Sequence, residues 1–272
     1  MNAVDDFLLA RQHFKEKYDF VTRISKIVGK QNVEPRRGWA NVLLFRLSLI
    51  GTSMLRLTDT DNDSGPKTNL EFYVLDHCSI AALGRALVEA AVMFAYLSDL
   101  NISEEEWRVR MDIIELHDLT ARRRLTKHLD DMKIDEAEDD PELRGRKEEL
   151  KSLVAASSVF RLVSDGKRQK DILDGKEVFL GGLRSVVREA GLDVNYFDAM
   201  WSMSSNFAHS HPSSFSRTGM RLTERAPHRI DINHQFLTLD IIFDYGTIWL
   251  KFACERTFLL YPELFLNGEL KH

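Results

Sequence analysis

Hydrophobic residues recur along this chain at the three- and four-residue spacing of amphipathic helices, and the pattern covers nearly its whole length. Residues 229–232 are the one stretch whose alternation suggests a short extended piece. The chain is therefore predicted to be all-α, a single multi-helix bundle of about seven to nine helices. The spacing predicts helices over residues 5–29, 38–57, 69–99, 103–132, 141–163, 193–210 and 231–261.

The polar residues between these helices predict where they begin and end. Ser103 with Glu106 three residues later forms a capping box, and Asp193 is placed to cap the helix that follows it. The acidic run in 133–142 is the best candidate for a hinge or an insertion boundary. Residues 165–182 hold four glycines among charged residues, which predicts an irregular and mobile stretch.

Composition places the chain among ordinary globular proteins. Its 272 residues are 44% hydrophobic and 29% charged, and we expect one domain over 1–272. The net charge of -5 provides no global field that would attract nucleic acid or an acidic membrane. Cys78 and Cys254 lie far apart in apolar runs, as buried thiols of a cytoplasmic protein do. The N-terminus carries acids where a signal peptide carries bases.

One predicted helix contains a charge pair in an apolar run. Residues 79–97 are long enough to cross a bilayer, but Arg85 and Glu89 fall near the middle, so we predict a buried helix and no membrane partner. His77 lies on one side of the same helix. In a functional interpretation the polar line faces a cleft and Arg85 anchors an anion. In a structural interpretation the ion pair fixes the register of the helix.

A second segment, residues 201–215, is rich in hydroxyls and also holds one amide and two histidines. The histidines would suit acid–base chemistry at a helix end, or the segment would simply cap and turn the chain. Combining the two segments predicts a composite site. Its catalytic candidates are Arg85, Glu89, Ser205 and His209, and its ligand-binding candidates are His77, Asn206, His211, Arg217 and Arg221.

Several common chemistries lack their motifs in this chain. The sequence has no H-E-x-x-H and no paired CxxC, so we predict no metal. It has no G-x-S-x-G nucleophile elbow, which disfavours a serine hydrolase. It has no Walker loop and no GxGxxG, so we predict no cofactor.

The segment RALVEAAVMFAYL, followed more than a hundred residues later by W-S-x-x-S-x-x-x-H, resembles an uncharacterised family of all-helical bacterial proteins. In that family an Arg-x-x-x-Glu helix precedes a Ser-x-x-x-His segment, which matches Arg85, Glu89, Ser205 and His209. The architecture is also similar to the helical HEPN superfamily (higher eukaryotes and prokaryotes nucleotide-binding). Many of its members are ribonucleases of toxin and phage-defence systems that use Arg-x(4–6)-His.

The resemblance implies a defence- or toxin-associated protein that is a ribonuclease or binds phosphorylated ligands through a polar cleft. RNA or a phosphorylated small molecule would be its partner. The alternative is a non-catalytic sensor or protein-interaction module with a protein partner, and a homo-oligomer fits either. Arg-x(4–6)-His spacing occurs several times, as in Arg110 to His117 and Arg229 to His234, so the spacing selects no pair.

Overall fold

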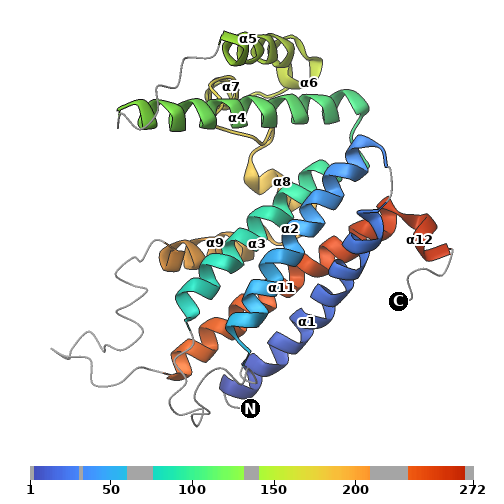
Figure 1. Cartoon of the computed structure of the whole chain (residues 1–272), viewed down its shortest axis with the longest axis vertical. Helices are drawn as coiled ribbons and strands as arrows, with labels where there is room; N and C mark the ends of the chain where they lie inside the picture. Colours follow the sequence, from blue (N-terminus) through green and yellow to red (C-terminus); the bar gives the residue numbers. More distant parts are fainter. Residues whose placement is uncertain (1–2, 31–32, 60–75, 132–140, 209–231, 267–272) are drawn as a thin grey trace. The chain divides into compact units, whose positions relative to one another are not determined.

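The computed structural model describes residues 3–30, 33–59, 76–131, 141–208 and 232–266 (Figure 1). Within these ranges the chain forms eleven α-helices and no strand, which confirms the all-α prediction and is close to the predicted number of helices. Residues 229–231, in the suggested extended piece, lie outside the described residues.

The chain divides into two compact units. Unit 1 comprises Met1–Ser98 and Ala190–His272, and unit 2 comprises Asp99–Glu189. The sequence predicted one domain with a candidate hinge or insertion boundary at 133–142, and that range falls inside unit 2. Unit 2 is thus an insertion between two segments of unit 1, and the pattern of hydrophobic positions along the chain does not reveal which helices pack together.

Unit 1 is built from long helices. They are α1 (Ala3–Val28), α2 (Pro35–Leu57), α3 (His77–Leu97), α9 (Val194–Ala208), α11 (Ile232–Leu260) and α12 (Pro262–Leu266). Helix α1 packs on α2 and α11, α3 packs on α2 and α11, and α9 covers another side of α3 (Figure 1). The third predicted helix begins, in the described residues, at His77, because the Asp76 carboxylate accepts a hydrogen bond from the Ser79 amide.

Aromatic side chains fill the contact between α1 and α11. The rings of Phe14 and Phe243 meet edge to face with centroids 5.0 Å apart, and Phe7, two turns earlier on α1, also packs against Phe243. Gly246 allows this close approach, because a Cβ there would lie 2.7 Å from the ring of Phe14. A glycine in the middle of this helix is therefore a packing requirement.

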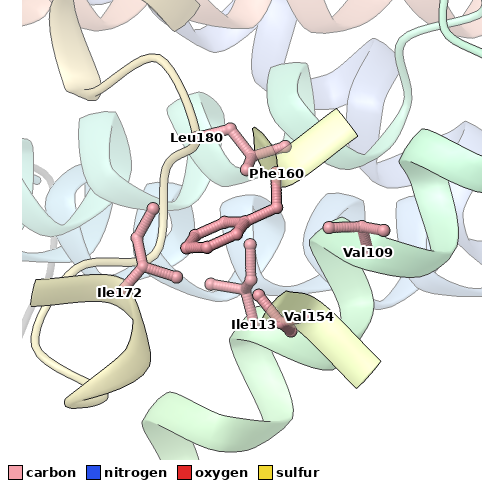
Figure 2. Close-up of a cluster of buried hydrophobic side chains, with 6 residues drawn as sticks. All are labelled: Val109, Ile113, Val154, Phe160, Ile172 and Leu180. Carbon is pink, nitrogen blue, oxygen red and sulfur yellow. The ribbon is translucent and has the colours of Figure 1, made fainter. Parts of the chain in front are cut away.

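Unit 2 is built from one long helix and four shorter ones. They are α4 (Glu104–Asp131), α5 (Pro141–Ala156), α6 (Ser158–Arg161), α7 (Gly166–Leu173) and α8 (Leu183–Glu189). Figure 2 shows the small core that α4 to α7 and the segment after α7 enclose. It consists of Val109, Ile113, Val154, Phe160, Ile172 and Leu180.

Two predictions for unit 2 were wrong. The helix predicted over 141–163 is interrupted at Ser157, whose hydroxyl accepts a hydrogen bond from the Val159 amide and starts α6. The stretch 165–182, predicted to be irregular, contains α7. Asp165 caps this helix through the amides of Lys167 and Arg168, and burial of Ile172 holds it on the core.

The predicted helix starts at Ser103 and Asp193 are confirmed. The Ser103 hydroxyl accepts a hydrogen bond from the Glu106 amide at 3.1 Å, and α4 follows at once. The Asp193 carboxylate accepts hydrogen bonds from the amides of Asn195 and Tyr196, and α9 begins at Val194. Both starts rest on local hydrogen bonds, which is why the sequence alone could place them.

Helices α2 and α3 are each long and apolar enough to cross a membrane by length and composition. Of the apolar 18-residue segment in each helix, 39% is buried in α2 and 61% in α3. Buried helices of globular proteins meet the same criterion, and α3 packs against α2, α9 and α11.

Candidate functional site

The candidate site lies where α3 packs against α9. The Arg85 guanidinium on α3 donates through Nη1 to the hydroxyl oxygen of Ser205 on α9. That hydroxyl in turn donates to the backbone carbonyl of Trp201 at 2.6 Å, so it is oriented to accept from the arginine. The structure thus brings together two of the four catalytic candidates that the sequence placed in separate segments.

Trp201 forms a third side of this site. The Cζ atom of Arg85 lies 4.4 Å from the centroid of the Trp201 ring, within cation–π range. The ring of Phe197 stacks on the same indole at 5.4 Å with an angle of 28° between the planes. We refer to Arg85, Glu89, Trp201 and Ser205 as the arginine clasp, because the last three fix the position of the first.

Glu89 completes the clasp from within α3. Its carboxylate accepts a hydrogen bond from Arg85 Nε at 3.0 Å, so the predicted ion pair is present. Both side chains were predicted to be mostly buried, which holds for Arg85 with an exposed fraction of 21% but is wrong for Glu89 with 51%. An ion pair that is half open to water contributes about 1 kcal/mol or less. Removing Glu89 therefore strands no buried charge.

His77 lies further toward the N-terminus of α3 and has the surroundings of a core residue. It is buried, and its ring meets the ring of Phe207 edge to face at 5.5 Å. The neighbouring Asp76 has a pKa below its usual range, first because the Ser79 hydroxyl and amide donate to it, and also because His77 is near. We assign His77 a packing role between α3 and α9.

None of the remaining candidates, catalytic or ligand-binding, joins the clasp in the described residues. Asn206 is exposed on α9. His209, His211, Arg217 and Arg221 lie outside the described residues, so the histidine half of the composite site stays a prediction. Among the described residues no three His, Cys, Asp or Glu side chains gather in a way that could hold a metal ion.

Trp201 is a residue of the site that was not among the candidates predicted from the sequence. The structure places its ring against Arg85. The four-residue spacing between Trp201 and Ser205 was the available signal, since residues so spaced share a helix face. Arg110, one of the arginines with ribonuclease-like spacing to a histidine, is buried and held by Glu106 on the same helix, which gives it a structural role.

A groove of about 550 Å³ lies elsewhere in unit 1, between α1 and α11. Phe20 and Phe258 pair across it at 5.4 Å, and Cys254 contributes to its wall. Burial raises the pKa of the Cys254 thiol to about 12, which keeps it protonated and unreactive at neutral pH. Its lining includes three basic and three acidic side chains, so the groove favours neither anionic nor cationic ligands.

Comparison of the chain with family models, with curated proteins and with solved structures finds no match. A function is therefore inferred from the geometry of the clasp and from the resemblance carried by Arg85, Glu89, Ser205 and His209.

Proposed function

We propose that the α3–α9 face of unit 1 binds a phosphorylated ligand, with Arg85 as the anion anchor. One observation carries this proposal: the guanidinium is held by Glu89, Ser205 and Trp201, while its Nη2 atom makes no hydrogen bond within the described residues. A fixed arginine with a free donor edge is a common way to recognise phosphate oxygens.

The clasp favours binding because it orders the arginine in advance. A free arginine side chain carries about 2 kcal/mol of rotamer entropy, part of which is lost when it closes on an anion. Stacking on the indole and two hydrogen bonds restrict that freedom before any ligand arrives. Glu89 has two opposing effects on binding: it orients Nε of Arg85, and its negative charge repels an anion. Because its side chain is half exposed to water, the repulsion is weakened.

RNA is the phosphorylated ligand that the resemblance favours, and a ribonuclease of a defence or toxin system is the corresponding activity. In that reaction Arg85 would stabilise the charge that develops on the phosphorane, and His209 would take the proton of the ribose 2′-hydroxyl. Ser205 would hold the arginine in place. Cytoplasmic location follows from the same proposal.

The binding step is tested with single-stranded RNA and with AMP, by fluorescence anisotropy and by calorimetry. We expect Arg85→Lys to weaken binding about tenfold, because lysine keeps the charge and loses the planar donor edge. Arg256→Lys is the matched control, since Arg256 also lies over an aromatic ring of unit 1, that of Phe252, and donates to the Ser98 carbonyl. Equal binding by the two variants would contradict the proposal.

The catalytic step is tested separately with His209→Ala. If the protein is a ribonuclease that uses His209, this variant should lose RNA cleavage and keep RNA binding. The non-catalytic alternative, a sensor or protein-interaction module, is favoured by one observation: Arg85 already has partners on three sides, as a purely structural arginine does. That alternative predicts that Arg85→Lys lowers the melting temperature and leaves ligand binding unchanged.

A further inference from the structure

Unit 2 carries a group of basic side chains where the C-terminal half of α4 meets α5 and the end of α7. Helix α4 packs on both of these helices. Gly175, in the turn after α7, lies so close to α4 that a Cβ there would collide with the Thr120 side chain. Arg123 and Arg124 lie one turn further along α4 and are exposed. We call the group the basic face, and its members are Arg123, Arg124, Lys147, Lys151, Lys170 and Lys176.

The two lysines of α5 lie beside the buried side of that helix. Leu150 and Val154 are fully buried, and Lys147 and Lys151 precede them by three residues each. Residues so spaced are neighbours on a helix surface, so both lysines border the contact of α5 with α4 and α7. Lys151 donates to Glu148 at 2.8 Å, whereas Lys147 forms no ion pair with another residue that the structure describes. The ammonium group of Lys147 is therefore open to an external anion.

The side chains at the end of α7 bring further positive charge to the same place. Lys176 donates to Asp174 at 2.8 Å, and this hydrogen bond is the main cause of the lowered pKa of Asp174. The charges of Lys170 and Lys151 lower that pKa further, because both ammonium groups lie near the same carboxylate. Lys170 and Lys176 are exposed. One acid thus stands among three bases that come from α5, α7 and the turn after α7.

The like charges of the basic face act against one another. Burial is the main cause of a lowered pKa for Lys147, and the charge of Lys151 lowers it further. Arg123 and Arg124, across on α4, act in the same direction, and Glu148 opposes them. A lysine with a lowered pKa carries a charge that is less stable in the folded chain than in the unfolded one. An anion that binds here relieves this repulsion.

We propose that the basic face of unit 2 binds the phosphodiester backbone of a nucleic acid. Its bases are spread over three segments of the chain, whereas a single phosphate group offers three acceptor oxygens. A polymer with successive phosphates therefore matches this surface better than a small anion does. Lysine and arginine contacts to phosphates orient a strand without reading its sequence. Because the whole chain has a net charge of -5, the attraction is local to this face.

The choice of a nucleic acid over another polyanion rests on the proposed function, in which RNA is the ligand of unit 1. The surface itself belongs to unit 2 and does not need the arginine clasp. An acidic bilayer is less suited, because a flat surface would also meet the carboxylates of Glu148 and Asp174, which stand among the bases.

Fluorescence anisotropy with a labelled single-stranded RNA, repeated over a range of salt concentrations, tests the basic face. The double variant Arg124→Gln, Lys147→Gln should bind about tenfold more weakly at low salt. The slope of log affinity against log salt concentration should fall by about 1.4, since each phosphate contact of a single strand contributes about 0.7. Circular dichroism should show a melting temperature at or above that of the wild type, because the variant removes charges that repel each other.

The matched control is the double variant Arg108→Gln, Arg161→Gln, which removes the same charge from the same unit. Both arginines are exposed. They lie near the opposite end of α4, because the Ser158 hydroxyl of α6 donates to Glu105 in the first turn of α4. The control should bind RNA as the wild type does. An affinity and a salt slope that are the same in the two double variants would overturn the proposal, as would a wild type that binds no RNA at low salt.

Competitors identify the ligand. Unlabelled single-stranded RNA and DNA of the same sequence should displace the labelled strand, and poly-glutamate of equal charge should displace it far less. Displacement by RNA alone would assign the face to RNA, and equal displacement by DNA would assign it to the backbone that both share. Equal displacement by poly-glutamate or by phosphatidylserine vesicles would overturn the assignment to nucleic acid.

AMP separates this inference from the proposed function, because it carries one phosphate and cannot span the basic face. The double variant Arg124→Gln, Lys147→Gln should bind AMP as the wild type does, whereas Arg85→Lys should bind it more weakly. A wild type that binds RNA through the basic face but does not bind AMP would refute the clasp and support this inference. AMP binding together with RNA binding that the double variant leaves unchanged would do the reverse.

Discussion

In unit 1 the largest side chains are buried between long helices, whereas in unit 2 a smaller and mainly aliphatic cluster is surrounded by ion pairs and helix caps. Phe14, Phe243 and Trp249 are fully buried in unit 1. In unit 2 the one aromatic ring of the core cluster is Phe160 (Figure 2). Arg146 joins α5 to α4 by donating to both carboxylate oxygens of Glu115, at 2.7 and 2.8 Å.

This difference separates two sources of stability. Burial of large apolar side chains contributes several kcal/mol per residue and responds little to salt or pH. Half-exposed ion pairs contribute about 1 kcal/mol or less, and salt and acid weaken them. We therefore expect the amides of unit 2 to exchange with solvent faster than those of unit 1, and we expect its response to pH to be larger.

The largest effect should come from the core of unit 1. Phe14→Ala removes a ring that is 0% exposed and packs on Phe243 and Gly246, so it should lower the free energy of unfolding by about 3–5 kcal/mol. Urea denaturation measures the loss, and hydrogen exchange should place it in α1 and α11. Leu9→Ala, on the same helix but 45% exposed, is the control. Similar losses in both variants would refute a core centred on Phe14.

A smaller effect should come from a turn in unit 2. Gly175 has a φ of +67°, and a Cβ there would collide with the side chain of Thr120. Gly175→Ala should therefore cost about 2 kcal/mol, through backbone strain and displacement of Thr120. Gly145→Ala in α5 is the matched control, because a Cβ there meets nothing within 4 Å. It should stabilise the helix by about 0.5–1 kcal/mol. Urea denaturation should show a lower free energy of unfolding for Gly175→Ala and a higher one for Gly145→Ala. A change of the same sign in both variants would contradict the prediction.

The smallest effect concerns the ion pair of unit 2. The hydrogen bonds from Arg146 hold the pKa of Glu115 below its ordinary value of 4.5. Because the folded pKa is the lower one, the stabilisation is complete above 4.5 and is lost as the pH falls through the folded pKa. Since both side chains are about 40% exposed, the loss should stay below about 1 kcal/mol.

Urea denaturation of the wild type and of Glu115→Gln at pH 6 and pH 3 measures this pair. The two proteins should differ at pH 6, and the difference should shrink as the pH is lowered toward 3. Asp112 is present in both proteins; burial raises its pKa most, and the neighbouring charge of Glu115 raises it further, so a part of the difference reflects Asp112. A difference that does not change between pH 6 and pH 3 would mean that Glu115 acts through packing.

Local chemistry explains which parts of the fold and site were predictable. The starts of α4 and α9 follow from Ser103 and Asp193, because a cap is a hydrogen bond between residues two or three apart. The pair of Arg85 and Glu89 follows in the same way from the four-residue spacing on one helix. The all-α fold class follows from the three- and four-residue spacing of apolar residues along the chain.

Tertiary packing decided the rest. The exposure of Glu89, the contact of Trp201 with Arg85 and the insertion of unit 2 depend on how helices far apart in the sequence approach one another. Helix α7 was missed for a related reason, since its charges and Gly166 favour a loop until Ile172 is buried in the core. Apolar periodicity says that a helix has a buried side, but the partner that covers it is fixed by shape and volume. The packing of α1 and α3 also decided which apolar side chains of α2 stay exposed, among them Val42, Phe45 and Leu49.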